Sequence, residues 1–450
     1  MDDPYDLTAR PIPQLIMKLA VPSSVGFFFN TMFNVVDTYF GGLISTQTLA
    51  ALSLSLSVFF MIIAIGTGIG AGTTALIANA LGEGDRTGAK LIAVQGITFG
   101  VLLSLVITAV GLWSSPFLFS LLGASGSYLN DALIYMDCIF VGTIFFIINY
   151  MLNAILNALG DTKSFRNFLM AGFVLNCALD PWLIYGGLSV PALGLAGIAL
   201  ATVLIQFLGC LYLGVRVWRT GLISDKRIKD IVPQPGPFRD IALQGFPAGI
   251  HMGTMGIGFF VITYFAALFG KEAVAAYGIA IPLLPTIGLN VATLAIVAHN
   301  NGAGLWDRIH QTLSTALRYG AVTMALGAVA VFAAAGPVMG LFTGDPLVIA
   351  IGTTYLRIAA FILYAYVILF VHVAALQGVK RPLFAIWIGL IRQIVLPVIV
   401  FYVLTSVISS TIVGIWWGIF GITWGAAIFT VVYVRRRLRA VESQQGARDS

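Results

Sequence analysis

The sequence predicts an all-α membrane protein with 12 transmembrane helices in two parallel-repeat six-helix bundles. Hydrophobic residues make up 59% of the 450 residues and charged residues only 9%, and the mean hydropathy is +0.97. A soluble domain carries about a quarter charged residues. Apolar stretches of about 20 residues recur along the chain, each long enough to cross a bilayer as a helix. They lack the alternation typical of a membrane β-barrel.

Twelve apolar segments account for the predicted helices. They cover residues 13–40, 49–81, 89–113, 128–158, 163–185, 191–217, 237–267, 274–301, 310–334, 346–377, 382–406 and 411–434. The connecting loops alternate in basic content: one set carries most of the 24 lysines and arginines, and the other holds only Lys271. By the positive-inside rule, both termini and the longest loop are predicted to be cytoplasmic, in a plasma (inner) membrane.

One long polar loop divides the chain into two halves. We predict a six-helix bundle over residues 1–218, a cytoplasmic linker over 219–236 and a second six-helix bundle over 237–450. Short segments repeat between the halves, as QGFP at 244–247 corresponds to LAVP at 19–22. Because each half has an even number of spans, the halves are predicted to be parallel repeats, an arrangement typical of transporters.

The run from Gly26 to Gly41 places polar groups inside the first span. Asn30, Asn34 and Asp37 recur at i, i+4 and i+7, so they share one face of the helix. A carboxylate in such apolar surroundings costs a few kcal/mol and is kept mostly where it meets a cavity or a partner. We therefore predict a proton- or cation-binding site at Asp37 and a substrate cavity lined by Asn30 and Asn34. The structural alternative is an Asp that reaches water near the helix end.

The fifth span adds a second acidic group. Asn176 and Asp180 lie one helical turn apart, and Pro181 follows directly. Proline leaves a carbonyl one turn upstream without its donor, and this oxygen can help to hold a cation or water. A cation site at Asp180 and Asn176 and a purely structural role in helix packing are both compatible with the sequence.

Polar residues in the fourth and sixth spans are candidates for the same site. Those on one broad face of the fourth span are Tyr135, Asn149, Asn153 and Asn157. They are compatible with a cavity wall and with hydrogen bonds between helices. Thr202 and Gln206 are candidates for the cavity wall in the sixth span. Asp137 lies nearer the outer end of the fourth span, where its side chain can reach water.

The C-terminal half has no carboxylate at the positions that match Asp37 and Asp180. Its intramembrane polar candidates are basic: His251, His299, His372, Arg357 and Arg392. Lone arginines and histidines in membranes pair with carbonyls or reach headgroups more often than they bind substrate, so the sequence leaves their role open.

Other functions lack their motifs. The P-loop, HExxH and GxSxG patterns are absent. The glycines at 66, 68, 70 and 72 predict close helix packing and not a dinucleotide site, because no strand precedes them. The basic residues follow the loops, so no nucleic-acid binding is predicted. We expect no cofactor or metal site other than the coupling ion, H⁺ or Na⁺.

Taken together, these motifs resemble the multidrug and toxic compound extrusion (MATE) family. The resemblance rests on FNVVDTYFGG in the first span, GEGDRTGA after the second, LNALGDTK after the fourth, NCALDPWLIYG in the fifth and ALQGVKRP after the tenth. It implies a V-shaped pair of bundles and a secondary antiporter that exports cationic or amphipathic drugs against H⁺ or Na⁺. The carboxylates look most like those of the DinF-like branch. The coupling site of that branch resembles Asp37 and Asp180, with Asn176, Asn153, Tyr135 and Thr202 nearby.

The predicted mechanism is antiport without enzymatic chemistry. Protonation of Asp37 removes a charge, and the first helix, softened at Pro22 and Gly26, then bends and closes the cavity. The expected partners are drug-like cations and the lipid bilayer, with the chain acting as a monomer. One rival is a lipid-linked oligosaccharide flippase of the same superfamily, which would need a strongly cationic cavity from Arg357 and Arg392. The other is an intramembrane transferase that uses Asp37 and Asp180 as acid and base.

Overall fold

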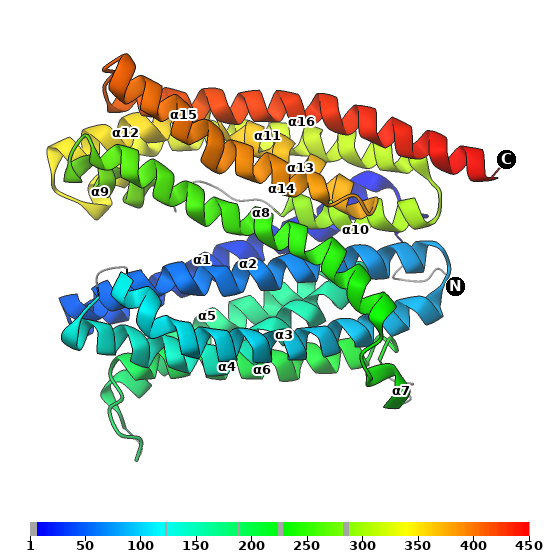
Figure 1. Ribbon diagram of the computed structural model, residues 1–450, viewed down its shortest axis with the longest axis horizontal. Helices are drawn as coiled ribbons and strands as arrows, with labels where there is room; N and C mark the ends of the chain where they lie inside the picture. Colours follow the sequence, from blue (N-terminus) through cyan, green and yellow to red (C-terminus); the bar gives the residue numbers. More distant parts are fainter. Residues whose placement is uncertain (1–6, 122–123, 188, 224–227, 282–287, 450) are drawn as a thin grey trace. The chain divides into compact units, whose positions relative to one another are not determined.

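The computed structural model describes residues 7–121, 124–187, 189–223, 228–281 and 288–449. Within these ranges the chain is helical apart from short loops and one isolated bridge between Gly187 and Val190 (Figure 1). The all-α prediction is therefore confirmed. By their contacts the helices form two compact units, which are described separately.

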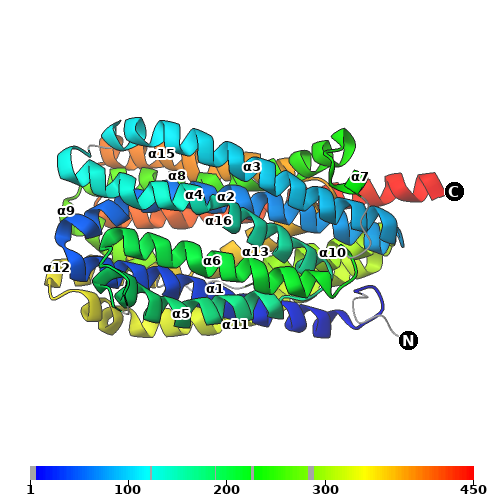
Figure 2. The same cartoon turned by 90° about the horizontal axis from the view of Figure 1, so that it is seen from below.

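Unit 1 is formed by residues 21–249. Its helices are most of α1 (Ile12–Ile44), α2 (Thr46–Gly82), α3 (Arg86–Leu121), α4 (Gly126–Ala158), α5 (Lys163–Tyr185), α6 (Leu195–Trp218), the short α7 (Ile228–Ile231) and the start of α8 (Pro235–Ala267). Helix α4 packs against α2, α3 and α6, and Figure 2 shows these four helices running alongside one another. The face that α4 buries carries Met136, Ile139 and Ile147, which are fully buried.

Unit 2 is formed by residues 7–20 and the chain from Ile250 onward. Its further helices are α9 (Lys271–Ala280), α10 (Leu289–Gly302), α11 (Trp306–Phe342), α12 (Pro346–Ala360), α13 (Leu363–Gly378), α14 (Leu383–Leu390), the π-helix η2 (Ile391–Val395), α15 (Leu396–Tyr402), the π-helix η3 (Val403–Val407) and α16 (Ile412–Asp449). Its largest fully buried side chains include Trp416 and Phe401.

In the described part of the chain, ten helices are long and apolar enough to span a membrane, and the bent pair α12–α13 makes an eleventh. The predicted span 346–377 corresponds to this pair, which bends by 50°. At the bend, Trp424 Nε1 donates to the carbonyl oxygen of Phe361 over 3.0 Å. A side chain that bonds to a helix carbonyl in this way is a recognised cause of a kink. The predicted span 274–301 corresponds to α9 and α10, and its middle lies outside the described residues.

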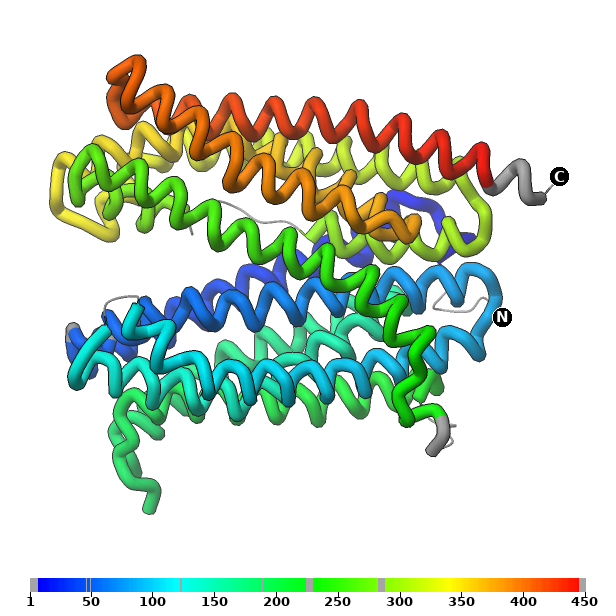
Figure 3. Tube along the Cα trace, viewed as in Figure 1, coloured from blue at the N-terminus to red at the C-terminus, as the bar shows by residue number. Residues whose placement is uncertain are grey.

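Two helices, α1 and α8, pass from one unit to the other. Helix α1 packs in unit 2 up to Ala20 and continues in unit 1, whereas α8 packs in unit 1 up to Gly249 and continues in unit 2. In both helices a proline, Pro22 or Pro247, lies within three residues of this change. Figure 3 traces both as uninterrupted helices. The predicted division of the chain at the linker 219–236 does not include this exchange of α1 and α8 between the units.

Polar side chains hold the segment that precedes each of these helices. In unit 2, Arg308 donates to the carbonyl oxygens of Arg10 at 2.7 Å and Leu7 at 3.3 Å. In unit 1, Gln95 donates to the carbonyl oxygens of Asp230 at 2.7 Å and Val232 at 2.8 Å. These bonds give a physical reason why α1 begins in unit 2 before it enters unit 1, and why α8 begins in unit 1 before it enters unit 2.

Glycines bring α2 into backbone contact with the start of α8 within unit 1. A Cβ on Gly68 would lie 2.1 Å from the backbone nitrogen of Gly249, and a Cβ on Gly72 would lie 2.5 Å from that of Gly245. Side chains larger than hydrogen cannot fit at such distances. The prediction of close helix packing at these glycines is confirmed.

Candidate functional site

A buried carboxylate on α1 joins three helices of unit 1. The side chain of Asp37 is 8% exposed. Its Oδ1 accepts a hydrogen bond from Asn176 Nδ2 on α5 at 2.6 Å, and its Oδ2 accepts one from Thr202 Oγ1 on α6 at 3.4 Å. An Asp that reaches water at a helix end would not make these contacts. The alternative in which the Asp37 side chain reaches water near the helix end therefore does not describe this fold.

The second carboxylate lies beside the first. Asp180 is fully buried on α5, one turn after Asn176, and it is close enough to interact electrostatically with Asp37. Among the described residues, neither oxygen of Asp180 accepts a hydrogen bond of good geometry, although the Asp37 carboxyl and the Asn176 amide lie close to it, and Asn176 Oδ1 has no partner either. Buried polar atoms are almost always paired. Three oxygens in one place without a donor therefore mark a position where a proton or a cation can bind.

Tyr135 on α4 completes the cluster. Its ring is 3% exposed, and its hydroxyl interacts electrostatically with both Asp37 and Asp180. Of the six residues predicted for the coupling site, the structure thus brings together five, contributed by four helices. The sixth residue, Asn153, is half-buried on α4, and its Oδ1 accepts no hydrogen bond from a described residue.

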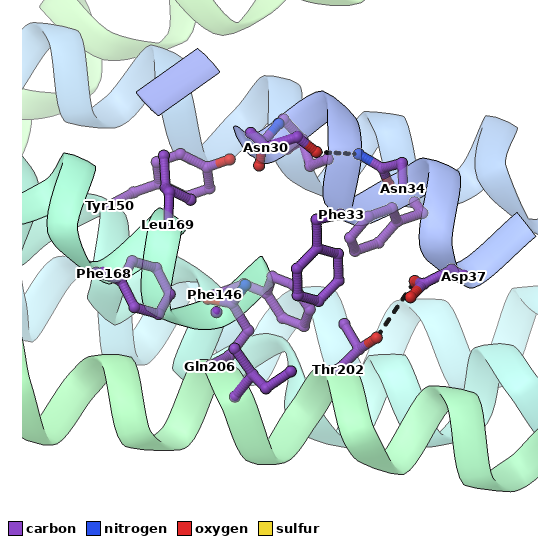
Figure 4. A pocket seen from close by; sticks show the side chains of 14 residues that line it. Asn30, Phe33, Asn34, Asp37, Phe146, Tyr150, Phe168, Leu169, Thr202 and Gln206 are labelled. Carbon is purple, nitrogen blue, oxygen red and sulfur yellow. Dashed lines mark hydrogen bonds between the residues drawn. The ribbon is translucent and has the colours of Figure 1, made fainter. Parts of the chain in front are cut away.

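A small cavity lies beside this cluster, within unit 1. Its volume is about 40 Å³. It is lined by Asn30, Phe33, Asn34, Asp37, Phe59, Ile63, Phe146, Tyr150, Phe168, Leu169, Gly172, Thr202, Ile205 and Gln206. Figure 4 shows Asn30, Asn34 and Asp37 along α1 at the cavity, with the bond between Thr202 and Asp37 at one end. A buried water needs about 10–15 Å³ of such space, so the cavity has room for a few waters.

The predicted cavity residues divide into two groups. Asn30 and Asn34 line the cavity, and Asn34 Nδ2 donates to the carbonyl of Asn30 at 2.9 Å. Asn149 instead bonds α4 to α6: its Nδ2 donates to the backbone carbonyl and to Oε1 of Gln206, both at 2.8 Å. Asn157 is half-buried and is not among the described residues that line the cavity. For Asn149, the interpretation as a bond between helices is the correct one.

Sequence reasoning missed the aromatic wall of the cavity. Tyr150 and the rings of Phe33, Phe146 and Phe168 line it, and Gly66 on α2 lies against the Tyr150 ring. A Cβ on Gly66 would approach the ring to 2.5 Å. Aromatic residues are common throughout this sequence, so no signal separated these four from core residues before their helices were placed.

The predicted hinge residues lie within a continuous α1. Pro22 is buried inside the helix, and Gly26 packs on α5, where a Cβ would lie 3.2 Å from Leu169 Cδ1. The helix is unbroken at both positions. Bending at this point stays a prediction.

Basic groups replace acids in unit 2. His251, His372 and Arg392 are buried, whereas Arg357 is exposed with its guanidinium 5.4 Å from the ring centroid of Phe332. His299 is buried on α10. Asp37 and Asp180 are the only buried acidic residues in the described chain, and both belong to unit 1. Of the two arginines that the flippase alternative needs for a cationic cavity, Arg392 is buried and Arg357 is exposed.

An ion pair outside the membrane spans fixes the ends of three helices. Asp161, between α4 and α5, lies 3.2 Å from Arg216 Nη2 on α6 and accepts hydrogen bonds from the backbone nitrogen and the hydroxyl of Ser164 at 3.0 and 2.6 Å. Burial acts to raise the pKa of Asp161, but the Ser164 hydrogen bonds and the Arg216 guanidinium outweigh it. The pKa is therefore lowered from 3.8.

The long apolar helices and the buried acid–amide cluster define a multi-pass membrane transporter. The chain belongs to the MatE family, whose model matches residues 22–182 and 247–403. It is 26% identical to the FAD transporter of Shewanella oneidensis over 88% of this chain and 89% of that protein. It is 24% identical to the multidrug export protein MepA of Staphylococcus aureus over 98% of both chains.

Solved structures agree with this assignment. The structure of an outward-facing multidrug resistance MATE family transporter of the MOP superfamily is 25% identical to this chain, with a TM-score of 0.89 over 97% of this chain and 98% of that one. The predicted MATE family and 12-helix class are confirmed. Since the relatives are named as transporters, the prediction of a transporter and not an enzyme is confirmed as well, and the transferase alternative falls away.

Proposed function

We propose that this transporter exports small cationic or amphipathic compounds in exchange for H⁺, and that Asp37 and Asp180 couple the two movements. The named activities of the relatives, multidrug export and FAD transport, support a small organic substrate. We also propose the cytoplasmic location of both termini, the plasma membrane as the site of action, a monomer and membership of the DinF-like branch. The basic loops and the N-terminal carboxylates support these assignments.

The observation that carries the coupling proposal is the unequal hydrogen bonding of the two acids. Asp37 accepts two hydrogen bonds, whereas both oxygens of the neighbouring Asp180 lack a donor among the described residues. Two ionised carboxylates in one buried site repel each other, so the pair favours binding a proton. One proton removes a charge and supplies the O–H donor that these oxygens lack. Sodium is the alternative coupling ion, since Asp37, Asp180 and Asn176 offer oxygens that Na⁺ could use.

The size of the cavity supports a mechanism in which the ion and the drug occupy it at different times. At about 40 Å³ it holds water or an ion, whereas a pocket for a drug-sized ligand measures about 300–1,000 Å³. A drug therefore requires the helices around the cavity to move apart. We propose that α1 makes this movement at Pro22 and Gly26, and that protonation of Asp37 favours the closed form because it removes the charge that attracts water or a cationic drug.

The available energy is sufficient for active export. A proton that moves down the membrane potential supplies about 2.3 kcal/mol per 100 mV. Each pH unit across the membrane adds about 1.4 kcal/mol. For a neutral compound both terms drive export. One-for-one exchange of a monovalent cation moves no net charge, so only the pH term drives it, about tenfold per pH unit.

The test is efflux of a fluorescent cationic dye from proteoliposomes under separately imposed proton and sodium gradients. Asp37→Asn should abolish proton-driven efflux. Asp137→Asn should leave it unchanged, because Asp137 is a half-buried acid of the same half that lies outside the cluster. Proton-driven efflux that survives in Asp37→Asn would refute the coupling role of Asp37. Efflux that responds to sodium alone would assign the site to Na⁺.

A further inference from the structure

Unit 2 buries one cation without an acidic partner. Arg392 is only 4% exposed, and no Asp or Glu among the described residues forms an ion pair with it. Its guanidinium carbon lies 5.3 Å from the ring centroid of Tyr366, a cation–π contact. Such a contact offsets only part of the cost of burying a charge, which is normally met by an opposite charge. The positive charge of Arg392 is thus available to an anion.

The groups around Arg392 cannot supply that negative charge. From residue 250 onward, the described part of the chain contains no buried Asp or Glu. His251 on α8 is a titratable neighbour that the charge of Arg392 influences. Gly389 lies against the His251 ring, since a Cβ there would sit 2.8 Å from Nδ1. A histidine adds no negative charge, so the site has a net positive character.

The backbone that carries Arg392 is unusual. Residues 391–395 form the π-helix η2 between α14 and α15. Pro397 follows it and has no N–H to donate to the carbonyl of Gln393, so the regular α-helical bonding cannot continue there. Single π-helical turns inside α-helices occur frequently at functional sites.

Aromatic rings extend from Arg392. Tyr366 stacks on Phe370, with ring centroids 6.3 Å apart, and both rings are half-buried. The Tyr366 hydroxyl also interacts with the Arg392 guanidinium. The surroundings of Arg392 therefore combine aromatic surface with a neutral polar group, and from residue 250 onward the described part of the chain places no buried carboxylate there.

We propose that Arg392 binds the oxyanion of an organic ligand, a carboxylate or a phosphate, and that Tyr366 and Phe370 hold the ligand's aromatic body. Arginine suits the role because its planar fork of N–H groups matches an oxyanion and stacks on aromatic rings. The subsite lies wholly in unit 2 and does not depend on proton coupling at Asp37. It adds anionic compounds, from the aqueous phase or from lipid headgroups, to the ligands this transporter accepts.

The test compares two probes that differ in one phosphate group, 2-naphthyl phosphate and 2-naphthol. Their binding to the purified full-length chain is measured by calorimetry in a phosphate-free maltoside detergent, without any ion gradient. The wild type should bind the phosphate about tenfold more tightly or better, as expected for charge-assisted hydrogen bonds in a buried site. Arg392→Gln should lose this preference. The absence of a preference in the wild type would overturn the proposal.

Arg357→Gln is the matched control. Arg357 makes the same kind of contact with an aromatic ring, at 5.4 Å from Phe332, but it is exposed, so its loss should leave the preference intact. Equal loss in both variants would show that overall charge and not this site binds the anion. If Arg392→Gln does not fold, Arg392→Lys keeps the charge and removes the planar fork. It should then fold and bind the phosphate more weakly, and unchanged binding would contradict the proposal.

Competition with phosphatidic acid in the same detergent distinguishes the two sources of anion. Displacement of 2-naphthyl phosphate that depends on Arg392 identifies a lipid headgroup, and binding that phosphatidic acid does not disturb identifies a soluble anion. Either result supports the site. Because no gradient is present, the outcome is also separate from that of the efflux experiment on Asp37.

Discussion

The side-chain amide of Asn176 donates to Asp37 Oδ1 across 2.6 Å and so connects residues that lie 139 positions apart in the chain. The Nδ2 atom of Asn176 thereby bonds to α1. Asp180 lies one turn further along α5, the helix that also carries Asn176. A change in the protonation of Asp180 is thus one helical turn away from the bond that holds α1 to α5. This link provides a physical route from ion binding to the movement of α1.

Replacement of the second acid tests the pair. Asp180→Asn is expected to reduce proton-driven efflux at least about tenfold, since only one titrating group then remains in the cluster. The thermal unfolding temperature should also depend less on pH, because a buried like-charge repulsion is gone. Both are measured on purified protein and in proteoliposomes, with Asp240→Asn, an exposed acid on α8, as the control. Wild-type efflux in Asp180→Asn would show that Asp37 acts alone.

Stiffening of α1 tests the hinge. In Pro22→Ala, residue 22 regains an N–H that can bond one turn back, and an interior proline costs a helix about 3 kcal/mol. We expect proton-driven efflux to fall while binding of the dye is retained. Pro337→Ala, which removes the interior proline of α11, should not reduce efflux. Normal transport by Pro22→Ala would remove the hinge from the mechanism.

The contact between α2 and α8 gives a stability prediction. A Cβ on Gly68 would lie 2.1 Å from a backbone nitrogen, which cannot move aside as a side chain can. Gly68→Ala should therefore destabilise the protein by about 1–3 kcal/mol, the usual cost of overpacking. Gly253→Ala meets nothing within 4 Å and should be neutral or stabilising by up to about 1 kcal/mol, because Ala favours a helix. Thermal unfolding in detergent measures both, and equal unfolding temperatures would contradict the packing.

The anchor of the N-terminal segment gives a local prediction. Arg308→Gln removes the guanidinium that donates to the carbonyl oxygens of Leu7 and Arg10. We expect faster cleavage after Leu7 in limited chymotrypsin digestion, because the backbone there loses its partner. Arg318→Gln on the same helix replaces an exposed arginine and should leave the rate unchanged. A cleavage rate in Arg308→Gln equal to that of the wild type would mean that other contacts hold the segment.

The ion pair of Asp161 predicts a pH dependence. The folded-state pKa of Asp161 is lowered below 3.8, so the ionised form stabilises the fold above that pH, and this stabilisation is lost as the pH falls through the folded pKa. Asp161→Asn should be less stable than the wild type at pH 7, and the difference should shrink as the pH falls below about 3.8. The difference should stay below about 1 kcal/mol, because the Arg216 side chain is 43% exposed. Thermal unfolding from pH 7 to 3 measures it, and a difference as large at pH 3 as at pH 7 would contradict the assignment.

The sequence alone determined the class of this protein and the identity of its acidic groups. Spans of about 20 apolar residues follow from the thickness of the bilayer, and the uneven basic content of the loops relates to the orientation of the chain. The helical spacing of Asn30, Asn34 and Asp37 placed them on one face, because a helix repeats every 3.6 residues. That face does line a cavity.

Only the tertiary structure decided which polar residues meet. Asn149 was a candidate for the cavity but bonds to Gln206, whereas Tyr150, its neighbour in sequence, lines the cavity instead. Which side of α4 faces α6 depends on how the helices rotate and pack, and helical spacing within one span cannot specify it. The exchange of α1 and α8 between units has the same origin, since the hydrogen bonds that fix it join segments far apart in the chain. Spacing along a helix is local, but the position of a site depends on contacts between helices.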